Sequence, residues 1–538
     1  SESLSFLSFF APFCIRAEPI MISEELRAVI AKYDQSHILK YYDEGLFTEE
    51  EKKHFETQLS KIDFERLDLI YKASMKQTAA SSQDAKLDPM DNITFADKLT
   101  QEEKDKYLTI TLDAIAKNEV ALILMGGGQG TRLGCSGPKG EYDIGLLSHK
   151  PLFQLQTERI LRMQEMASRR AGKKCAVHCY VMTSPMTHAD TLKFYRDHHY
   201  FGLEPEQVVF FSQGTLPCMD DNGHIILSSR SEIATAPDGN GGLYMGLYKS
   251  AITVNGVEDA SRCVLDDMVA KGAKYVQIYG VDNAFVRIPD PLMFGVFIAD
   301  GDDVGNACVL KNSPTERVGI VCRKAGKYEV VEYSELSDVI ANMRDAQGNL
   351  VFGAGFICNL WCTVEFLRTK CNPASLPLLY HIAHKAIPYY DDAAKETVKP
   401  KQPNGVKMES FIFDVFPFSQ KMGCTLVSRT HFTPVKNSND AKFDCPDTAR
   451  EIMTTTFVNW LKAAGCELEG EVVSSCVEVS GLVSFDGENL ERLSGLKLQL
   501  PCFICQKSEA SEEELKGATK VSDAVVLVKK EFNEYVFL

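Results

Sequence analysis

No uninterrupted apolar run in this 538-residue chain approaches the roughly 20 residues that a membrane-spanning helix needs. An excess of basic residues is also missing, since 58 Lys and Arg stand against 74 Asp and Glu for a formal net charge of −16. That balance argues against a surface that coats nucleic acid or adheres to anionic lipid. We therefore predict no nucleic-acid partner and no membrane partner. Any polyanionic ligand must meet a local cluster of basic groups.

The 17 cysteines lack the regular spacing of a disulfide framework, and the chain is far larger than domains that depend on disulfides. Their number is odd, so reduced thiols and a cytoplasmic location are the simpler prediction. Cys502 and Cys505 have the spacing of half a zinc site, but no second pair or spaced histidines accompany them. We predict packed thiols there and no zinc.

Composition and length predict more than one domain, because single cores rarely grow beyond about 300 residues. Residues 1–21 carry a short apolar patch without a basic leading region, and we interpret them as a dispensable extension. Residues 22–100 have helical periodicity in their first part and are predicted to form a helical N-terminal region. We expect a catalytic domain over 101–446, and a helix followed by a small β-rich domain over 447–538.

Alternating strands and helices predict an α/β domain. The run "VALILM" (120–125) is typical of a buried strand, and residues 152–171 are predicted to be a helix that ends at Gly172. Further strand candidates are "CAVHCYVMTS", "QVVFFSQG" and "YVQIYGVDN". Such alternation indicates a mostly parallel sheet flanked by helices, with ligand loops at the carboxyl ends of the strands.

A glycine-rich loop follows the first of these strands. Its glycines allow a sharp turn and expose backbone N–H groups that can hold phosphate oxygens; they are Gly126, Gly127, Gly128, Gly130 and Gly134. No Gly-Lys-Ser/Thr closes the loop, which excludes a Walker loop, and Leu133 occupies the third glycine of a dinucleotide fingerprint. Arg132 and Lys139 add fixed positive charges, so the loop is predicted to bind an anion.

The segment "GGGQGTRLGCSGPKGEYDIGL" resembles the signature of the eukaryotic UDP-sugar pyrophosphorylase family, and within it the UDP-N-acetylglucosamine pyrophosphorylases. The resemblance continues, in order, through "FFSQGTLPC", "IATAPDGNGGLY", "IYGVDN", "NSPTERVGIVCR", "PNGVKMESFIFDVF" and "FTPVKN". It covers roughly residues 22–500. It implies a Rossmann-like nucleotidyltransferase fold of GT-A-like type, with a mixed, mostly parallel sheet.

The resemblance also implies a reaction between UTP and a sugar 1-phosphate that yields a UDP-sugar and pyrophosphate. N-acetylglucosamine 1-phosphate is the expected sugar, and N-acetylgalactosamine 1-phosphate is a candidate second one. Attack on the α-phosphorus in line needs positioning and charge neutralisation and no protein nucleophile. The implied catalytic residues are Arg132, Lys139 and Lys436, and Asp282 is the implied ligand of Mg²⁺.

Residues that would bind the substrates follow from the same resemblance. The uridine and phosphates would be covered by Met125, Gly126, Gly127 and Gly128, whereas Gln213 and the turn of Asp238 with Gly239, Asn240 and Gly241 would recognise uracil and ribose. Gly319, Glu332 and Lys436 match positions that contact the sugar or its phosphate. Phe411 and Phe413 match aromatic residues near the acetamido group, although by spacing alone both are more often core residues.

One stretch departs from the family. In "GAGFICN", Gly353 and Phe356 stand where relatives have asparagines, and only Asn359 remains as a candidate contact to the sugar hydroxyls. A site that loses a matched polar partner loses specificity quickly, so discrimination between gluco and galacto epimers is in question.

Two alternatives stay open from the sequence. The first keeps the chemistry and changes the sugar, giving a UDP-glucose, UDP-galactose or broad UDP-sugar pyrophosphorylase, which "NLW" at 359–361 favours. The second is a nucleotide-sugar binding protein without catalysis, although Arg132, Lys139, Asp282 and Lys436 are all present. A monomer or weak homodimer is expected.

Overall fold

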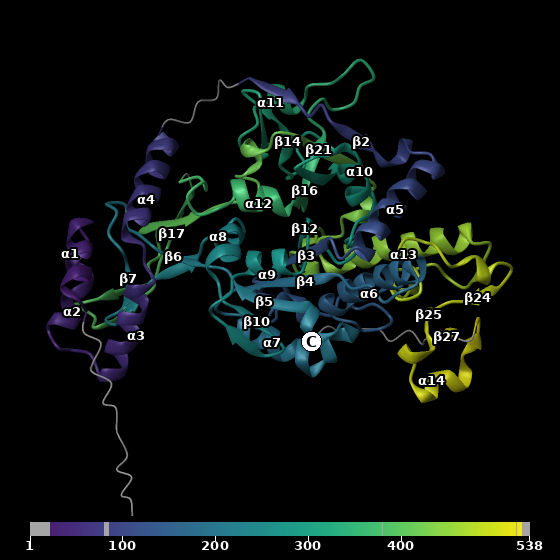
Figure 1. Ribbon diagram of the computed structural model, residues 1–538, viewed down its shortest axis with the longest axis horizontal. Coiled ribbons are helices and arrows are strands. Elements are labelled where there is room, and N and C mark those ends of the chain that lie inside the picture. The colour runs from purple at the N-terminus through teal and green to yellow at the C-terminus, as the bar shows by residue number, and fades with distance from the viewer. Residues whose placement is uncertain (1–21, 80–85, 379, 523, 530–538) are drawn as a thin grey trace, which may run out of the picture. The chain divides into compact units, whose positions relative to one another are not determined.

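The computed structural model describes residues 22–79, 86–378, 380–522 and 524–529, so the predicted extension over 1–21 lies outside it (Figure 1). The chain forms two compact units. The smaller takes in the described residues of 1–81, 215–236 and 378–409, and the larger those of 82–214, 237–377 and 410–538. Among the described residues, no helix has both the length and the apolar character needed to cross a membrane.

A large mixed sheet forms the centre of the larger unit. Its four inner strands are parallel, run in the order β5-β4-β3-β12, and are β5 (Val208–Ser212), β4 (His178–Thr183), β3 (Val120–Met125) and β12 (Tyr275–Gly280). Antiparallel β16 (Ala354–Thr363) continues the sheet, followed by β13 (Val304–Leu310), β21 (Met422–Val427) and β2 (Ile93–Phe95). The predicted α/β class and parallel strands are confirmed.

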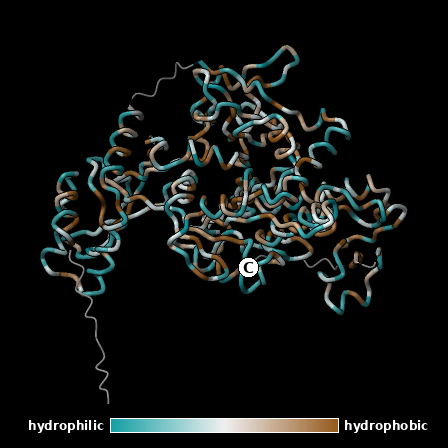
Figure 2. The backbone as a smooth tube through the Cα atoms, in the orientation of Figure 1, coloured by the Kyte–Doolittle hydropathy of each residue, from teal (hydrophilic) through white to brown (hydrophobic). Residues whose placement is uncertain are grey.

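Helices cover both faces of this sheet (Figure 1). One face packs against α5 (Gln101–Ala116), α6 (Leu152–Ala171), α7 (His188–Asp197) and α10 (Pro291–Asp300). The other packs against α8 (Gly242–Lys249), α9 (Val264–Ala270) and α12 (Val364–Lys370). Residues of β3 alternate between the two cores, with Leu122 and Leu124 on the first face and Ile123 on the second. Figure 2 shows the hydrophobic segments gathered in these central strands.

Local signals in the sequence set the ends of the helices. Thr100 and Glu103 form the predicted capping box at the start of α5. Gly172 ends α6 with φ 65°, a left-handed conformation that glycine adopts without strain. Both predicted boundaries are confirmed. Because each helix begins or ends beside a strand terminus, these boundaries also fix where the loops emerge.

The smaller unit is not the contiguous 22–100 region predicted from the sequence. Its helices are α1 (Glu24–Lys32), α2 (Lys40–Asp43), α3 (Glu49–Ser60) and α4 (Phe64–Ala79). Their hydrophobic core is completed by Met219, Ile225, Val406 and Met408, which come from two later insertions. These insertions carry short strands, among them β6 (Thr215–Pro217), β7 (Leu227–Ser229), β17 (His381–Lys385) and β20 (Gly405–Glu409). Strand β2 also falls within the predicted 22–100 region, but it joins the sheet of the larger unit.

The C-terminal region contains the predicted helix, α13 (Pro446–Ala463), and the predicted strands. Four of these form one sheet in the order β23 (Val477–Val479), β25 (Cys502–Gln506), β27 (Val525–Lys529) and β26 (Thr519–Lys520). The region is not a separate unit, however. Phe457 and other residues of α13 share a hydrophobic core with Leu133 of the glycine-rich loop and with Ile144, which follows the loop. Val435, the neighbour of Lys436, belongs to the same core. The C-terminal region thus supports that loop directly.

A buried lysine joins the C-terminal region to the start of α6. Lys150 Nζ lies 2.6 Å from Glu158 Oε2 and 2.5 Å from Glu509 Oε1. Glu478 accepts from Ser148 N at 2.8 Å and from Ser148 Oγ at 2.6 Å. Burial raises the pKa of the Glu478 and Glu158 carboxyls. The ammonium of Lys150 is the positive charge that faces Glu158, Glu478 and Glu509 in this desolvated cluster.

Replacing this lysine should destabilise the larger unit strongly. Lys150→Met keeps the length and apolar stem of the side chain but removes the charge that the buried carboxyls face. Breaking a buried ion pair from one side costs about 3–5 kcal/mol, because the remaining charge is left uncompensated. Urea unfolding followed by circular dichroism measures this loss.

The matched control is Lys193→Met. Lys193 forms an exposed ion pair on α7, with Nζ 2.5 Å from Asp197 Oδ2, and such pairs contribute about 0–1 kcal/mol. Equal losses for the two variants would contradict the role given to Lys150.

Candidate active site

The glycine-rich loop leaves the carboxyl end of β3 and folds back on itself. Gly126 N donates to Met182 O of β4 at 2.8 Å, which continues the sheet by one residue. Gly130 N donates to Gly137 O at 3.0 Å, and Lys139 N donates to Gly128 O at 3.0 Å. The two arms of the loop are therefore paired, and the pairing fixes Lys139 beside the end of β3.

Two of the glycines are favoured by geometry. A Cβ added at Gly127 would lie 3.0 Å from the carbonyl carbon of Thr183 and 3.1 Å from Ser184 N, so the backbone beside it would have to shift slightly to admit a side chain. Gly134 has φ 84°, a conformation in which other residues are strained. Glycine at these two positions lets the loop hold this shape without strain.

Positive charge gathers at the loop. Lys139 is half-buried, and its pKa is lowered first by burial and then by the nearby charges of Lys436 and Arg132, whereas Asp282 opposes that shift. The four side chains that the sequence assigned to phosphate and metal chemistry are thus within electrostatic reach of one another. Arg132 is exposed and has no hydrogen bond or ion pair among the described residues. The arrangement is suited to an anion with several charges.

Asp282 follows the end of β12, next to the end of β3. Its backbone O accepts from Val435 N at 2.8 Å, and Ala284 N donates to Thr433 O at 3.1 Å. This pairing brings Lys436 to the same edge of the sheet. Within the described part of the chain, the Asp282 carboxylate has no hydrogen-bond or ion-pair partner. Its oxygens are therefore available for a ligand.

Gln213 and the turn over 238–241 lie together at the next strand ends. Gln213 N donates to Thr183 O at 2.9 Å, which places the residue after β5. A Cβ added at the following residue, Gly214, would lie 3.0 Å from Asp238 Oδ2. Asp238 is buried beside the start of α8, and burial raises the pKa of its carboxyl to about 7. Gln213 and this turn are therefore close enough to contact the same ligand.

The turn also positions the aromatic residues. Asn240 Oδ1 accepts from Ile412 N at 2.9 Å, and Gly241 N donates to Ser410 O at 2.9 Å. Phe411 and Phe413 flank Ile412, and their ring centroids are 5.2 Å apart. Asn240 thus has a structural role through its oxygen, while its amide nitrogen makes no hydrogen bond to any described residue.

Gly319 and Glu332 are also neighbours. A Cβ added at Gly319 would lie 3.3 Å from Glu332 Oε1, and Gly319 O accepts from Phe356 N at 2.8 Å. The ring of Phe356 packs edge-on against Phe413, with 5.6 Å between centroids. The residue that departs from the family pattern therefore contacts one of the two aromatic residues assigned to the sugar.

The structure places Asn359 in β16 opposite Tyr279, the residue before the last one of β12. Its side chain is buried in the sheet, 2% exposed, and its Oδ1 accepts from Gln277 Nε2 at 2.8 Å. Its neighbour Cys358 is the residue of β16 within electrostatic reach of Asp282 and Lys436. The side-chain oxygen of Asn359 is thus engaged within the sheet by Gln277.

Asp444 was missed by the sequence analysis. Its Oδ2 lies 3.9 Å from Lys436 Nζ, and its backbone O accepts from Lys436 N at 2.6 Å. Nothing in "KFDCPD" distinguishes this aspartate from an ordinary loop residue, so only the fold reveals the contact. Asp444 holds Lys436 and offsets part of the positive charge of the cluster.

A metal cage made by the protein alone is not present in the described residues, where no group of three or more His, Cys, Asp and Glu side chains could hold a metal ion. The 16 described cysteines are free thiols, in agreement with the predicted packed thiols at Cys502 and Cys505. Asp282 is therefore not part of a metal cage made by the protein alone, and a cation beside it would take most of its ligands from substrate and water.

Comparison with known proteins gives a consistent set of relatives. The family described as UTP--glucose-1-phosphate uridylyltransferase matches residues 64–461. UDP-N-acetylhexosamine pyrophosphorylase-like protein 1 of Xenopus tropicalis is 44% identical over 394 residues, covering 70% of this chain and 74% of that protein. UDP-N-acetylglucosamine pyrophosphorylase of Saccharomyces cerevisiae is 39% identical over 437 residues, covering 80% and 88%.

Solved structures agree with these relatives. The uridine diphosphate N-acetylglucosamine pyrophosphorylase of Trypanosoma brucei, solved with an inhibitor, matches with a TM-score of 0.75 and 30% identity, covering 88% of this chain and 95% of that one. A UDP-glucose pyrophosphorylase of Leishmania major, at 14% identity and a TM-score of 0.51, shares the fold.

The buried Asp238 carboxyl gives the larger unit a testable dependence on pH. Burial raises its folded pKa to about 7, whereas the unfolded chain releases this proton near pH 4. The folded state therefore holds an extra proton between these values, and the wild type loses stability as the pH rises through that window. Asp238→Asn removes the titration, so the variant should gain stability relative to wild type by at most about 1.4 kcal/mol per pH unit, levelling off above pH 7.

Urea unfolding at a series of pH values measures the difference between the two proteins. Asp259→Asn is the control, because Asp259 is exposed and its hydrogen bonds to Ser261 lower its pKa. If the difference in unfolding free energy between Asp238→Asn and wild type does not change with pH, or grows as the pH falls, the raised pKa of Asp238 is wrong.

Proposed function

The chain belongs to the UTP--glucose-1-phosphate uridylyltransferase family, and from this we propose that it is a UDP-N-acetylglucosamine pyrophosphorylase. The reaction joins UTP to N-acetylglucosamine 1-phosphate and releases pyrophosphate. The observation that carries the proposal is the gathering of Arg132, Lys139 and Lys436 with the unpartnered Asp282 carboxylate at the glycine-rich loop. Three cations together with the Asp282 carboxylate match a nucleoside triphosphate and a metal ion, while Asp444 lies beside Lys436.

The choice of sugar rests on the relatives. The description of the matched family names glucose 1-phosphate as the sugar substrate. The relatives at 39% and 44% identity are instead named for N-acetylglucosamine and N-acetylhexosamine. The aromatic pair of Phe411 and Phe413 supports the same choice, since a flat apolar surface suits an acetamido methyl group. Gly319 and Glu332, which lie beside Phe356, would contact the sugar hydroxyls.

The uridine would be recognised at the ends of β3 and β5. Uracil presents an N–H donor between two carbonyl acceptors, and the amide of Gln213 can pair with part of that pattern. Met125 and glycines 126–128 would cover the nucleoside and phosphates with backbone N–H groups. The turn of Gly239, Asn240 and Gly241 would hold the ribose, with the free amide nitrogen of Asn240 as a donor.

The chemistry needs no protein nucleophile. An oxygen of the sugar phosphate attacks the α-phosphorus of UTP as the bond to the departing pyrophosphate breaks on the opposite side. Arg132 would stabilise the charge that builds on pyrophosphate, and Lys139 and Lys436 would neutralise the two reacting phosphates. Because Lys139 is partly desolvated, its interaction with a phosphate is stronger than that of an exposed lysine.

Magnesium is the cofactor that fits this site. Mg²⁺ is commonly held by one or two carboxylates together with substrate phosphates and water, and Asp282 supplies one carboxylate without a competing partner. The ion would supply charge neutralisation at the phosphates. Asp282 would hold it, and the pairing of residues 282–284 with 433–435 keeps Asp282 near the segment that carries Lys436.

The edge-on packing of Phe356 against Phe413 supports a broader sugar specificity. An aromatic ring at this position cannot hydrogen-bond a sugar hydroxyl, so the two epimers at C4 lose one basis for discrimination. We therefore include N-acetylgalactosamine 1-phosphate as a second substrate. The free thiols support a reducing, cytoplasmic environment. A monomer or weak homodimer is proposed, which light scattering after gel filtration would check.

Arg132→Ala should reduce turnover by roughly a hundredfold or more, because one positioned charge contributes on the order of 3 kcal/mol to the transition state. The side chain is exposed and makes no contact that the fold needs, so the melting temperature should stay unchanged. The control is Arg169→Ala, which removes an exposed arginine on α6 that pairs only with Glu165. Turnover by Arg132→Ala close to that of the control would rule out the assigned role.

Pyrophosphate release from UTP and magnesium with four separate sugar phosphates tests the function as a whole. We expect N-acetylglucosamine 1-phosphate to be the preferred substrate, with N-acetylgalactosamine 1-phosphate within about tenfold because one hydroxyl contact is absent. Glucose and galactose 1-phosphates should react more slowly. Preference for glucose would move the assignment to a UDP-glucose enzyme, and no release with any sugar would favour a binding protein.

A further inference from the structure

Asp238 lies where three segments of the candidate active site meet. Its Oδ2 lies 3.0 Å from the position that a Cβ at Gly214, the neighbour of Gln213, would occupy. Its backbone O accepts from Ser410 N at 2.8 Å and from Ser410 Oγ at 3.0 Å, and the turn over 239–241 follows it directly. The residues assigned to uracil, ribose and the acetamido group adjoin this junction, which consists of residues 214, 238–242 and 410.

The chain leaves or re-enters the larger unit at each of these segments. One stretch of that unit ends at Gly214, the next begins at Pro237 after the first insertion, and another begins at Ser410 after the second. Only the first segment directly continues a strand of the central sheet, because Gly214 lies two residues beyond the end of β5. Side-chain contacts at the junction therefore help to set the spacing of the other two.

The Asp238 side chain fills space that glycines leave open. A Cβ added at Gly242, the first residue of α8, would lie 1.9 Å from Asp238 Oδ1 and 2.3 Å from Cγ, so it would displace the carboxyl. A Cβ added at Gly241 would lie 2.7 Å from Phe411 O. The start of α8 is thus packed closely against both Asp238 and the segment that carries Phe411. The carboxyl acts as a spacer between Gly214 and Gly242.

Hydrogen bonds and ion pairs do not explain why an aspartate stands at this place. Asp238 is 5% exposed, and its buried Oδ1 has no hydrogen-bond partner among the described residues. Burial raises the pKa of the carboxyl to about 7, and no charged neighbour within the described part of the chain contributes to that shift. A buried oxygen without a donor lowers stability. The position of the side chain is therefore what Asp238 contributes.

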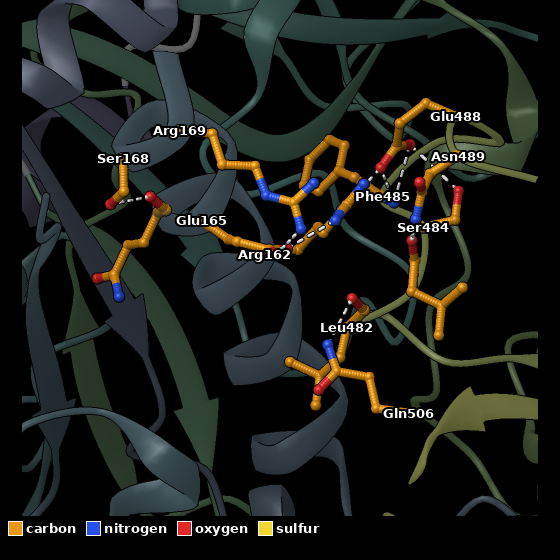
Figure 3. A network of polar contacts seen from close by, with 12 residues as sticks. Arg162, Glu165, Ser168, Arg169, Leu482, Ser484, Phe485, Glu488, Asn489 and Gln506 are labelled. Carbon is orange, nitrogen blue, oxygen red and sulfur yellow. Dashed lines mark hydrogen bonds and ion pairs between the residues drawn. The ribbon is translucent and has the colours of Figure 1, made fainter. Parts of the chain in front are cut away.

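Carboxylates that stabilise the fold have a different environment. Figure 3 shows Glu488 next to α6, where its Oε1 accepts from Arg162 Nε at 2.9 Å and from Phe485 N at 2.9 Å. The buried carboxylate of Asp267 likewise accepts from Tyr180 OH at 2.8 Å. Both carboxylates meet donors from other segments, as buried polar groups in proteins usually do. The carboxyl at the junction lacks such donors, which sets it apart from these structural groups.

We propose that Asp238 is a positioning residue of the proposed reaction: its side chain sets the spacing of Gln213, the turn over 239–241 and the segment of Phe411, so that base, ribose and sugar are held in one register. The substrates do not have to touch Asp238, because it acts through the backbone of these segments. The inference rests on the proposed function, since the ligands of that site define it. Disturbing the junction should weaken recognition of the base and of the sugar together.

Binding of UTP and of CTP, each with magnesium and without sugar phosphate, tests the spacing at the base. Calorimetry should show that wild type prefers UTP, because the amide of Gln213 would pair with uracil. Asp238→Ala should bind UTP at least about tenfold more weakly and lose most of the preference over CTP, because a small displacement of Gln213 weakens a matched contact. Asp238→Asn keeps the size of the side chain and should keep the preference. The control is Asp259→Asn, on the edge strand β11 (Val257–Asp259), which should bind as wild type does.

Exchanging the two side chains tests the spacer itself. Gly242→Ala adds a methyl group that displaces the carboxyl, so it should reproduce the loss seen in Asp238→Ala. In the double variant, the new methyl group takes the space that the carboxyl leaves, and UTP affinity should be about threefold or more above that of Gly242→Ala alone. KM for N-acetylglucosamine 1-phosphate should follow the same order, since Ser410 anchors the segment of Phe411 to Asp238. A residue needed only for folding would lower the melting temperature of both single variants and leave the base preference unchanged.

Failure of this inference is distinguishable from failure of the proposed function. A wild type that binds UTP no better than CTP would contradict the uracil site, and with it the function on which the inference rests. A wild-type preference that Asp238→Ala retains, strictly additive losses in the double variant, or equal losses in Asp238→Asn and Asp238→Ala would overturn the role of Asp238 alone. If Asp238→Ala does not fold, Gly242→Ala decides in its place, because it displaces the carboxyl without removing it.

Discussion

Three like charges are held close together at the site proposed to bind a triphosphate. Lys139, Lys436 and Arg132 repel one another, and that repulsion together with burial lowers the pKa of Lys139. The fold offsets the repulsion with Asp282, and Asp444 lies beside Lys436. An anion placed among them is stabilised by charges that need no reorganisation, which is how electrostatic catalysis of phosphoryl transfer operates. In a chain with a net charge of −16, such a cluster exists only where the fold imposes it.

The remaining structure explains how the charges stay in place. The paired arms of the glycine-rich loop fix Lys139, and the pairing of residues 282–284 with 433–435 ties Asp282 to the segment that carries Lys436. Beneath both, the C-terminal helix α13 and strands share a core with residues that flank the loop. The buried Lys150 cluster joins those strands to α6. A C-terminal region that looks peripheral in the sequence is therefore part of the support of the active site.

The sequence predicted the features that are local. A strand followed by glycines, the capping box of α5, the end of α6 and the position of Asp282 at a strand end all follow from short-range patterns, and the structure has them. The sequence did not predict the features that depend on packing between residues far apart in the chain. The smaller unit recruits two distant insertions, which no boundary in composition marks. Asn359 is held by Gln277 across the sheet, and Asp444 meets Lys436 only after folding.

The most direct test of this account is a crystal structure of the protein with UTP and magnesium bound. The account predicts phosphate oxygens within hydrogen-bond distance of the backbone N–H groups of glycines 127 and 128 and of Lys139 Nζ, the metal ion on Asp282, and uracil against Gln213. A nucleotide whose phosphates lie elsewhere, with Lys139 and Asp282 left without contact to it, would contradict the central claim.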